Sequence, residues 1–274
     1  MANCSSISLV TITNNQPTKA EVFNDKIICS FTDTLKAKPV FQGTSSWILI
    51  SGTGVALTPS NPISLVNNLG LGTNKFEFIV TKANCVSKAV LSRTNNLPSV
   101  SLVSNDTIIC ENKLSIMANL PLQGIGRWVT NKGIGIISNS LSNTISINGI
   151  GKGLNSYIWS VTSGFCPASI DSIQVFNYSV FKPTTSGTNC IILTTNTSSI
   201  VELNSNELVS GESATWTIFP NASYTFSPNS LASNITVGGV GRGFYRMVRD
   251  VFDSFGGTCR SKDTVLVSVI PESN

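Results

Sequence analysis

The sequence predicts an all-β chain made of tandem two-sheet sandwiches, each closed by one disulfide. Three observations support this fold class. Short runs rich in Val, Ile, Thr and aromatic residues alternate with Gly, Asn, Ser and Pro every 8–12 residues. Long sequence segments recur 81 positions apart, and the order Cys, Trp, Cys occurs three times. A repeat at a fixed period indicates an array of similar units.

The repeat defines the units. "FNDKIIC" at 23–29 returns as "SNDTIIC" at 104–110, and "ANCSSISLVTITNNQP" at 2–17 returns as "ANCVSKAVLSRTNNLP" at 83–98. A proline lies at each junction, where it removes a hydrogen-bond donor and stiffens the connection. The prediction is three units with part of a fourth before them: residues 1–16 as the closing strands of a preceding truncated unit, then units at 17–97, 98–178 and 179–274.

Within each unit we expect strands and no helix. The strand-like runs are "SWILIS" (46–51), "FEFIV" (76–80), "NTISING" (143–149), "YIWSVT" (157–162), "NITVGG" (234–239) and "DTVLVSV" (263–269). Their alternation places all four tryptophans in the cores. The Gly-x-Gly elements "GLG", "GIGKG" and "GVGRG" precede strands. We therefore interpret them as turns and not as phosphate-binding loops, which open a helix.

The cysteine spacing predicts one bridge within each unit. Cys29 and Cys85 lie 56 positions apart, as do Cys110 and Cys166, and Cys190 and Cys259 lie 69 apart. Each pair brackets a tryptophan, as in immunoglobulin-like (Ig-like) sandwiches where a disulfide joins the sheets. Such bridges require an oxidising compartment. The alternatives are free buried thiols in a cytosolic protein, or zinc, which the lack of histidine and of any Cys-x-x-Cys pair disfavours. Cys4 is left unpaired.

The pattern of a unit resembles the Ig-like and PKD-like repeats of very large surface proteins of Bacteroidetes, including gliding-motility adhesins and other proteins exported by the type IX system. The residues that carry it in the second unit are Cys110, Leu114, Ala118, Trp128, Gly149, Gly151, Tyr157, Trp159, Val161, Cys166, Asp171, Ile173 and Val175. This resemblance implies a secreted segment at the cell surface that serves in adhesion.

Composition excludes several function classes. Charged residues make up 12% of the chain and the net charge is +4, without a basic run, so nucleic acid is not an expected partner. No apolar stretch is long enough for membrane insertion. The chain has no histidine, which removes the usual nucleophilic triads and most transition-metal sites. We therefore predict no enzyme activity, no cofactor and no metal.

One charged cluster departs from this background. The stretch "GRGFYRMVRDVFDSFGGTCRSKD" (241–263) gathers charged residues in a chain otherwise poor in charge, Arg260, Lys262 and Asp263 among them. Within it the candidate ligand or partner surface consists of Arg242, Arg246, Arg249, Asp250 and Asp253. Arginine forks match carboxylates, so this surface suits an anionic partner. The alternative is a network of salt bridges that covers long strands.

The leading functional hypothesis is a non-catalytic stalk or spacer of a bacterial adhesin, with neighbouring repeats, surface polysaccharide or protein as partners. One alternative is a carbohydrate-binding segment of a secreted polysaccharide-degrading protein, for which Tyr178, Phe181, Tyr224 and Phe226 are the unassigned aromatic residues. Another is a fibre subunit in which the strand at 5–14 is added to a neighbouring chain.

Overall fold

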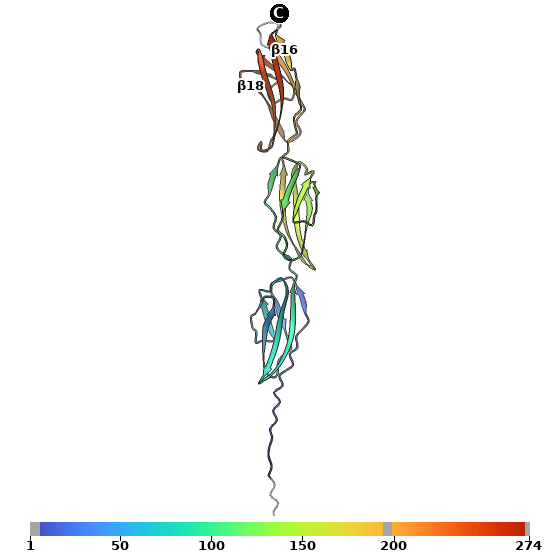
Figure 1. Ribbon diagram of the computed structural model, residues 1–274, viewed down its shortest axis with the longest axis vertical. Helices are drawn as coiled ribbons and strands as arrows, with labels where there is room; N and C mark the ends of the chain where they lie inside the picture. Colours follow the sequence, from blue (N-terminus) through green and yellow to red (C-terminus); the bar gives the residue numbers. More distant parts are fainter. Residues whose placement is uncertain (1–5, 194–198, 272–274) are drawn as a thin grey trace, which may run out of the picture. The chain divides into compact units, whose positions relative to one another are not determined.

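The computed structural model describes residues 6–193 and 199–271, and in that part of the chain every regular element is a β-strand (Figure 1). The predicted all-β class is confirmed. The strands form three sandwiches, each of two sheets. No helix of the described residues is long and apolar enough to cross a membrane.

The first sandwich holds seven strands. They are β1 (Lys26–Ile28), β2 (Asp33–Lys36), β3 (Thr44–Ser51), β4 (Val55–Ala56), β5 (Ile63–Asn67), β6 (Gly72–Lys82) and β7 (Cys85–Asn95). One sheet has the order β1-β7-β6-β3 and the other the order β2-β5-β4. The short β1 runs parallel to the end of β7, with Ile28 opposite Asn95.

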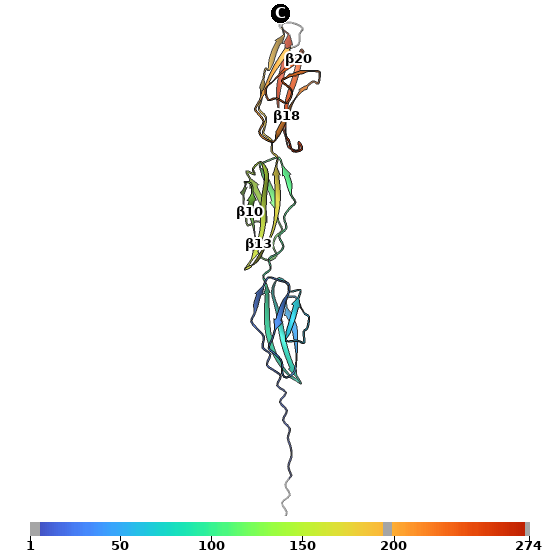
Figure 2. The same cartoon turned by 180° about the vertical axis from the view of Figure 1, so that it is seen from behind.

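The second sandwich repeats this plan. Its strands are β8 (Thr107–Ile109), β9 (Lys113–Met117), β10 (Ile125–Lys132), β11 (Ile136–Ile137), β12 (Thr144–Asn148), β13 (Gly153–Ser163) and β14 (Cys166–Asn177). The sheets have the orders β10-β13-β14-β8 and β11-β12-β9, and Figure 2 shows β10 beside β13. Strand β8 again runs parallel to the end of its partner, with Ile109 opposite Asn177.

The described residues of the third sandwich form eight strands. They are β15 (Thr185–Gly187), β16 (Cys190–Leu193), β17 (Ser199–Ser205), β18 (Glu212–Phe219), β19 (Thr225–Ser227), β20 (Ile235–Val240), β21 (Gly243–Asp253) and β22 (Arg260–Pro271). The sheets have the orders β15-β17-β20-β19 and β16-β22-β21-β18. All six runs that the sequence predicts as strands coincide with strands, apart from the end residues Asn143, Gly149 and Asn234.

Alternation along the strands builds the cores. On β6 the inward residues Phe76, Phe78 and Val80 are at most 1% exposed, and on β13 the matching residues are equally buried. All four tryptophans are at most 3% exposed, as predicted. The glycine elements lie where β5 connects to β6, β12 to β13 and β20 to β21, with some of their end residues inside the strands, which confirms that they make turns between strands.

No strand crosses the predicted unit boundaries at 97/98 and 178/179. Residues 6–16 form no strand, and residues 1–5 lie outside the described part, so the assignment of 1–16 to a preceding unit stays a prediction.

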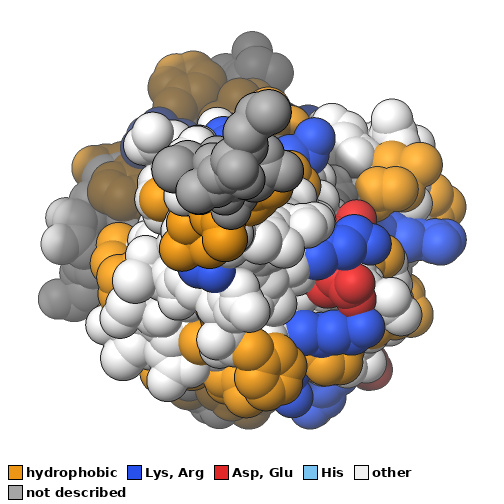
Figure 3. Space-filling view, turned by 90° about the horizontal axis from the view of Figure 1, so that it is seen from below, with side chains coloured by type: hydrophobic (Ala, Val, Ile, Leu, Met, Phe, Trp, Pro, Cys, Tyr) orange, Lys and Arg blue, Asp and Glu red, His pale blue; other side chains and the backbone are white. Residues whose placement is uncertain are grey.

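The chain divides into two compact bodies. One joins the first sandwich to residues 119–127 and 159–171, and the other joins the rest of the second sandwich to the third. Figure 3 shows a face that is mainly uncharged, as the composition implies.

Candidate functional site

Each of the first two sandwiches carries its two cysteines at opposite ends. Cys29 follows β1, and β1 ends opposite Asn95, the last residue of β7. Cys85 is the first residue of the same 11-residue strand. At about 3.3 Å per residue the two cysteines lie roughly 33 Å apart. A disulfide requires Cα atoms within about 7 Å, so these two cysteines cannot bond.

The predicted pairing within units is therefore wrong. The bridges join Cys29 to Cys166 and Cys110 to Cys259, with Cα–Cα distances of 5.4 and 5.2 Å. Each bridge links the first-strand cysteine of one sandwich to the hairpin cysteine of the next, and each lies inside one compact body. Cys85 and Cys190 are free and exposed, against the prediction. Cys4 lies outside the described residues.

The first joint is the segment around Asn95–Pro98. The amide of Asn96 donates to the carbonyl of Ile28 at 2.8 Å, and that carbonyl lies 3.7 Å from Sγ of Cys166. From the second sandwich, Nε2 of Gln123 donates to the carbonyls of Asn95 and Leu97 at 2.7 and 3.2 Å. The disulfide is thus one part of a joint that also fixes the connecting backbone.

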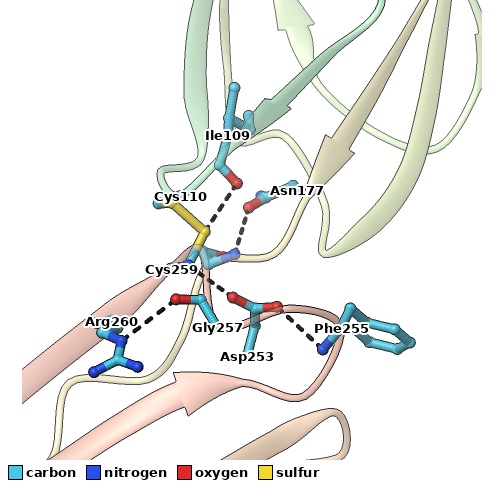
Figure 4. Close-up of a disulfide and its surroundings, with 9 residues drawn as sticks. Ile109, Cys110, Asn177, Asp253, Phe255, Gly257, Cys259 and Arg260 are labelled. Carbon is cyan, nitrogen blue, oxygen red and sulfur yellow. Dashed lines mark hydrogen bonds between the residues drawn. A yellow bond between two sulfur atoms is a disulfide. The ribbon is translucent and has the colours of Figure 1, made fainter.

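The second joint has the same plan (Figure 4). The amide of Tyr178 donates to the carbonyl of Ile109 at 3.0 Å. This carbonyl lies 3.5 Å from Sγ of Cys259. Asp253, which is 1% exposed, accepts from the amides of Cys259 and Phe255 at 2.7 and 3.1 Å and so shapes the loop that presents the cysteine.

Further contacts strengthen the second joint. The ring of Tyr178 stacks on that of Phe255 at a centroid distance of 5.1 Å. Nζ of Lys152 pairs with Oε1 of Glu212 at 3.2 Å, and the Glu212 side chain is 1% exposed. Glu212 also accepts from the amide of Phe181 at 2.7 Å. Burial and hydrogen bonding make this pair stronger than a fully exposed one.

The charged cluster predicted as a partner surface divides into two groups. Arg249 and Asp253 point inward from β21 and are at most 1% exposed. Nη1 and Nη2 of Arg249 each donate at 3.0 Å to the carbonyls of Ala232 and Leu231, and its guanidinium lies 5.5 Å from the Trp216 ring. These two residues cannot contribute to an open surface, because they belong to the interior.

Of the other three members, two are exposed and Asp250 is partly buried. Arg242 and Arg246 are exposed, and Asp250 pairs with Arg260 and Lys262 at 3.4 and 3.2 Å. The Arg246 guanidinium lies 4.9 Å from the centroid of the Phe219 ring.

Arg246 also lines a surface groove of about 490 Å³. The other residues of the groove are Asn189, Phe219, Pro220, Phe244, Tyr245, Leu266, Val267 and Ser268. Phe219 and Phe244 are 42% and 82% exposed. The groove thus combines a cation with open aromatic faces.

The aromatic residues that the sequence proposed for carbohydrate have other roles, apart from the exposed Phe181. Tyr178 belongs to the second joint, and Tyr224 and Phe226 pack against the core of the third sandwich. Alternation along β18 and β21 could have placed Phe219 and Phe244 outside and Arg249 inside.

Hydrogen bonds that favour the charged carboxylate lower the pKa of Asp33 and of Asp263. Burial alone raises the pKa of Asp33, but hydrogen bonds from the Thr34 amide and from the side chains of Arg93 and Lys26 outweigh it. The pKa of Asp263 is lowered chiefly by the hydrogen bond from the Thr185 amide.

Among the described residues, no group of three or more His, Cys, Asp or Glu side chains could hold a metal ion.

The fold is that of tandem Ig-like domains. Solved structures with a similar arrangement of strands include the three-Ig fragment I67–I69 of titin in a Glu-to-Ala variant, with a TM-score of 0.50 and 8% identity, covering 95% of this chain and 100% of the titin fragment. The D1–D4 ectodomain fragment of ICAM-5 gives a TM-score of 0.51 at 8% identity, over 92% of this chain and 77% of the fragment. No family model matches the sequence, and no curated protein matches it.

Proposed function

We propose that this chain is a non-catalytic, extracellular segment that keeps a surface and a distal partner connected. The observation that carries the proposal is the pair of disulfides between successive sandwiches. Disulfides persist in oxidising compartments, which favours a location outside the cytosol. Arg249 and Asp253 are buried, and Asp33 is held by Arg93 and Lys26, which leaves few charged groups for chemistry.

The bridges give the chain redundant covalent connections. Three segments, 29–110, 110–166 and 166–259, run in parallel between the bridge at Cys29–Cys166 and the bridge at Cys110–Cys259. A break in one of them leaves the other two, so the ends stay joined. This property suits a stalk that bears load or meets proteases. It is tested by cutting the chain at the first joint and asking whether its ends separate.

We further propose that the stalk belongs to a bacterial cell-surface adhesin of the kind that the sequence resembles, including the adhesins of gliding motility. The tandem Ig-like fold and the surface poor in charge support this assignment. Neighbouring repeats are its first partners, and surface polysaccharide or protein would be bound at a distal end.

A second candidate function is carbohydrate binding by the groove on the third sandwich. It is favoured by the exposed Phe219 and Phe244 beside Arg246, because aromatic faces pack against sugar rings and arginine pairs with carboxylates.

We expect the chain to bind the acidic polysaccharide alginate more tightly than neutral dextran. Phe244→Ser with Arg246→Ser should weaken alginate binding about tenfold, a loss of about 1.4 kcal/mol.

The matched control for this test is Phe41→Ser, which removes a side chain 86% exposed on the first sandwich. Binding to immobilised alginate is measured by surface plasmon resonance. Equal binding by the groove variant and the control would exclude the groove as the site.

A further inference from the structure

We propose that the first sandwich carries a third joint, at which Cys85 forms a disulfide with another Ig-like sandwich whose last strand is residues 6–14. The partner is defined by two features. It lacks a last strand of its own, and it has a cysteine directly after its first strand. The proposal rests on the proposed function and names the partner of this joint, and its test measures the folding of that partner and the bonding of Cys85.

The backbone at residues 14–18 already has the conformation of the other joints. Oδ1 of Asn14 accepts from the amide of Gln16 at 2.9 Å. The same turn is made in the two occupied joints, at 3.0 and 2.9 Å, by the pairs Asn95–Leu97 and Asn177–Ser179. Three copies of one turn, each before a sandwich, indicate one kind of connection.

A side chain of the first sandwich holds this segment as Gln123 holds the first joint. Gln123 donates to the carbonyl of Asn95 at 2.7 Å. At the equivalent place, Nζ of Lys82 donates to the carbonyl of Asn14 at 3.2 Å and to Oε1 of Gln42 at 2.6 Å. The matched carbonyls, of Asn14 and Asn95, are therefore both bound from the sandwich that follows them.

Cys85 matches a bonded cysteine. Cys85 begins β7 and Cys166 begins β14, in each case directly after the hairpin turn. Cys166 bonds Cys29, whereas Cys85 is free and exposed. This end of the first sandwich thus has the connecting backbone of a joint and its hairpin cysteine, and it lacks only the partner cysteine that would complete the disulfide.

The segment before the joint is an unpaired strand sequence. Ile7, Leu9 and Ile12 are 91–93% exposed, and residues 6–14 form no sheet. They align with β7, 81 positions later, which is the strand that β1 joins in parallel. Apolar side chains this exposed are stabilised by joining a sheet.

The geometry of the occupied joints then identifies the incoming sulfur. Ile28 pairs with Asn95, and the next residue, Cys29, reaches the hairpin cysteine of the following sandwich. A partner whose first strand pairs in parallel with residues 12–14 would place its next residue against Cys85. The same strand that completes the partner therefore also positions the disulfide.

The bond forms by oxidation of two thiols. A small-molecule disulfide in the oxidising compartment accepts two electrons and two protons and becomes two thiols, while Cys85 and the partner cysteine lose their hydrogens and form one S–S bond. Sγ of Cys85 is exposed and so accessible to this exchange.

The test adds the missing sandwich. Residues 17–82 are placed ahead of residue 2 of the full chain, so that the repeated "ANC" leads into residues 6–14 as the last strand. After oxidation with glutathione disulfide, mass spectrometry without reductant is expected to find the added copy of Cys29 bonded to Cys85. Cys85→Ser should leave that added cysteine open to iodoacetamide.

The source of the partner is distinguished by supplying residues 17–82 as a separate polypeptide. Bonding of this piece to Cys85 supports a partner from another molecule, and bonding only in the fused chain supports a neighbour in the same polypeptide. The proposal is overturned if the added segment stays unfolded in the fused chain, as measured by hydrogen exchange, or if it folds while Cys85 is still fully alkylated. Neither failure would alter the two bridges on which the proposed function rests.

Discussion

Cutting the first joint is expected to leave the two ends of the chain covalently joined. A specific protease site is inserted beside Val100, which is 68% exposed in the connection between the first two sandwiches. The chain is anchored by its N-terminus to beads and carries a tag at its C-terminus. After cleavage and a urea wash, the tag should stay on the beads, because Cys29–Cys166 spans the cut. Adding reductant should release all of it.

Two cysteine variants make this experiment specific. Cys29→Ser removes the bridge across the cut, so cleavage alone should release the tag. Cys85→Ser removes a free cysteine of the same sandwich and should retain the tag as the unsubstituted chain does. If the bridges instead lay within the sandwiches, cleavage would release the tag from all three proteins. Western blotting of bead and wash fractions distinguishes these results.

Replacing Arg249 with alanine should destabilise the third sandwich by about 3 kcal/mol. The change removes two hydrogen bonds and the contact with Trp216 from a fully buried position, and it leaves the Leu231 carbonyl without that donor. Arg249→Met should cost less, because methionine refills much of the volume without bringing a charge into the core. Hydrogen exchange of peptides from β18 to β22 reports the stability of this sandwich directly.

Arg246→Ala is the matched control, since Arg246 lies on the same strand but is exposed. It loses only its contact with Phe219, so the cost should not exceed about 1 kcal/mol. Equal protection in the Arg249→Ala and Arg246→Ala proteins would contradict the interior role of Arg249. A surface role would instead show as lost binding with unchanged exchange.

Strands and cores were predictable because alternation along a strand is a local property. Phe76, Phe78 and Val80 lie on one face of β6, and the sequence alone shows this period. The same period applied to β21 places Arg249 on the inward face, between Met247 and Val251. Charge led to the surface interpretation of Arg249, although Trp216 and two carbonyls were available to hold its guanidinium inside.

The bridge pairing was not predictable from spacing alone. Equal separations of 56 residues are produced by any repeat with two cysteines, whichever of them bond. The deciding fact is that β1 runs parallel to the end of β7, which carries Cys29 away from Cys85. One local signal did exist. Cys85, Cys166 and Cys259 each follow turn residues, which places them at hairpin ends and not in the middle of a strand.

The central claim is that disulfides join successive sandwiches, and peptide mapping tests it most directly. The oxidised protein is alkylated, digested and analysed by mass spectrometry without reductant. We predict linked peptides that contain Cys29 with Cys166 and Cys110 with Cys259, and alkylated Cys85 and Cys190. Peptides that link Cys29 to Cys85, or Cys110 to Cys166, would contradict the account.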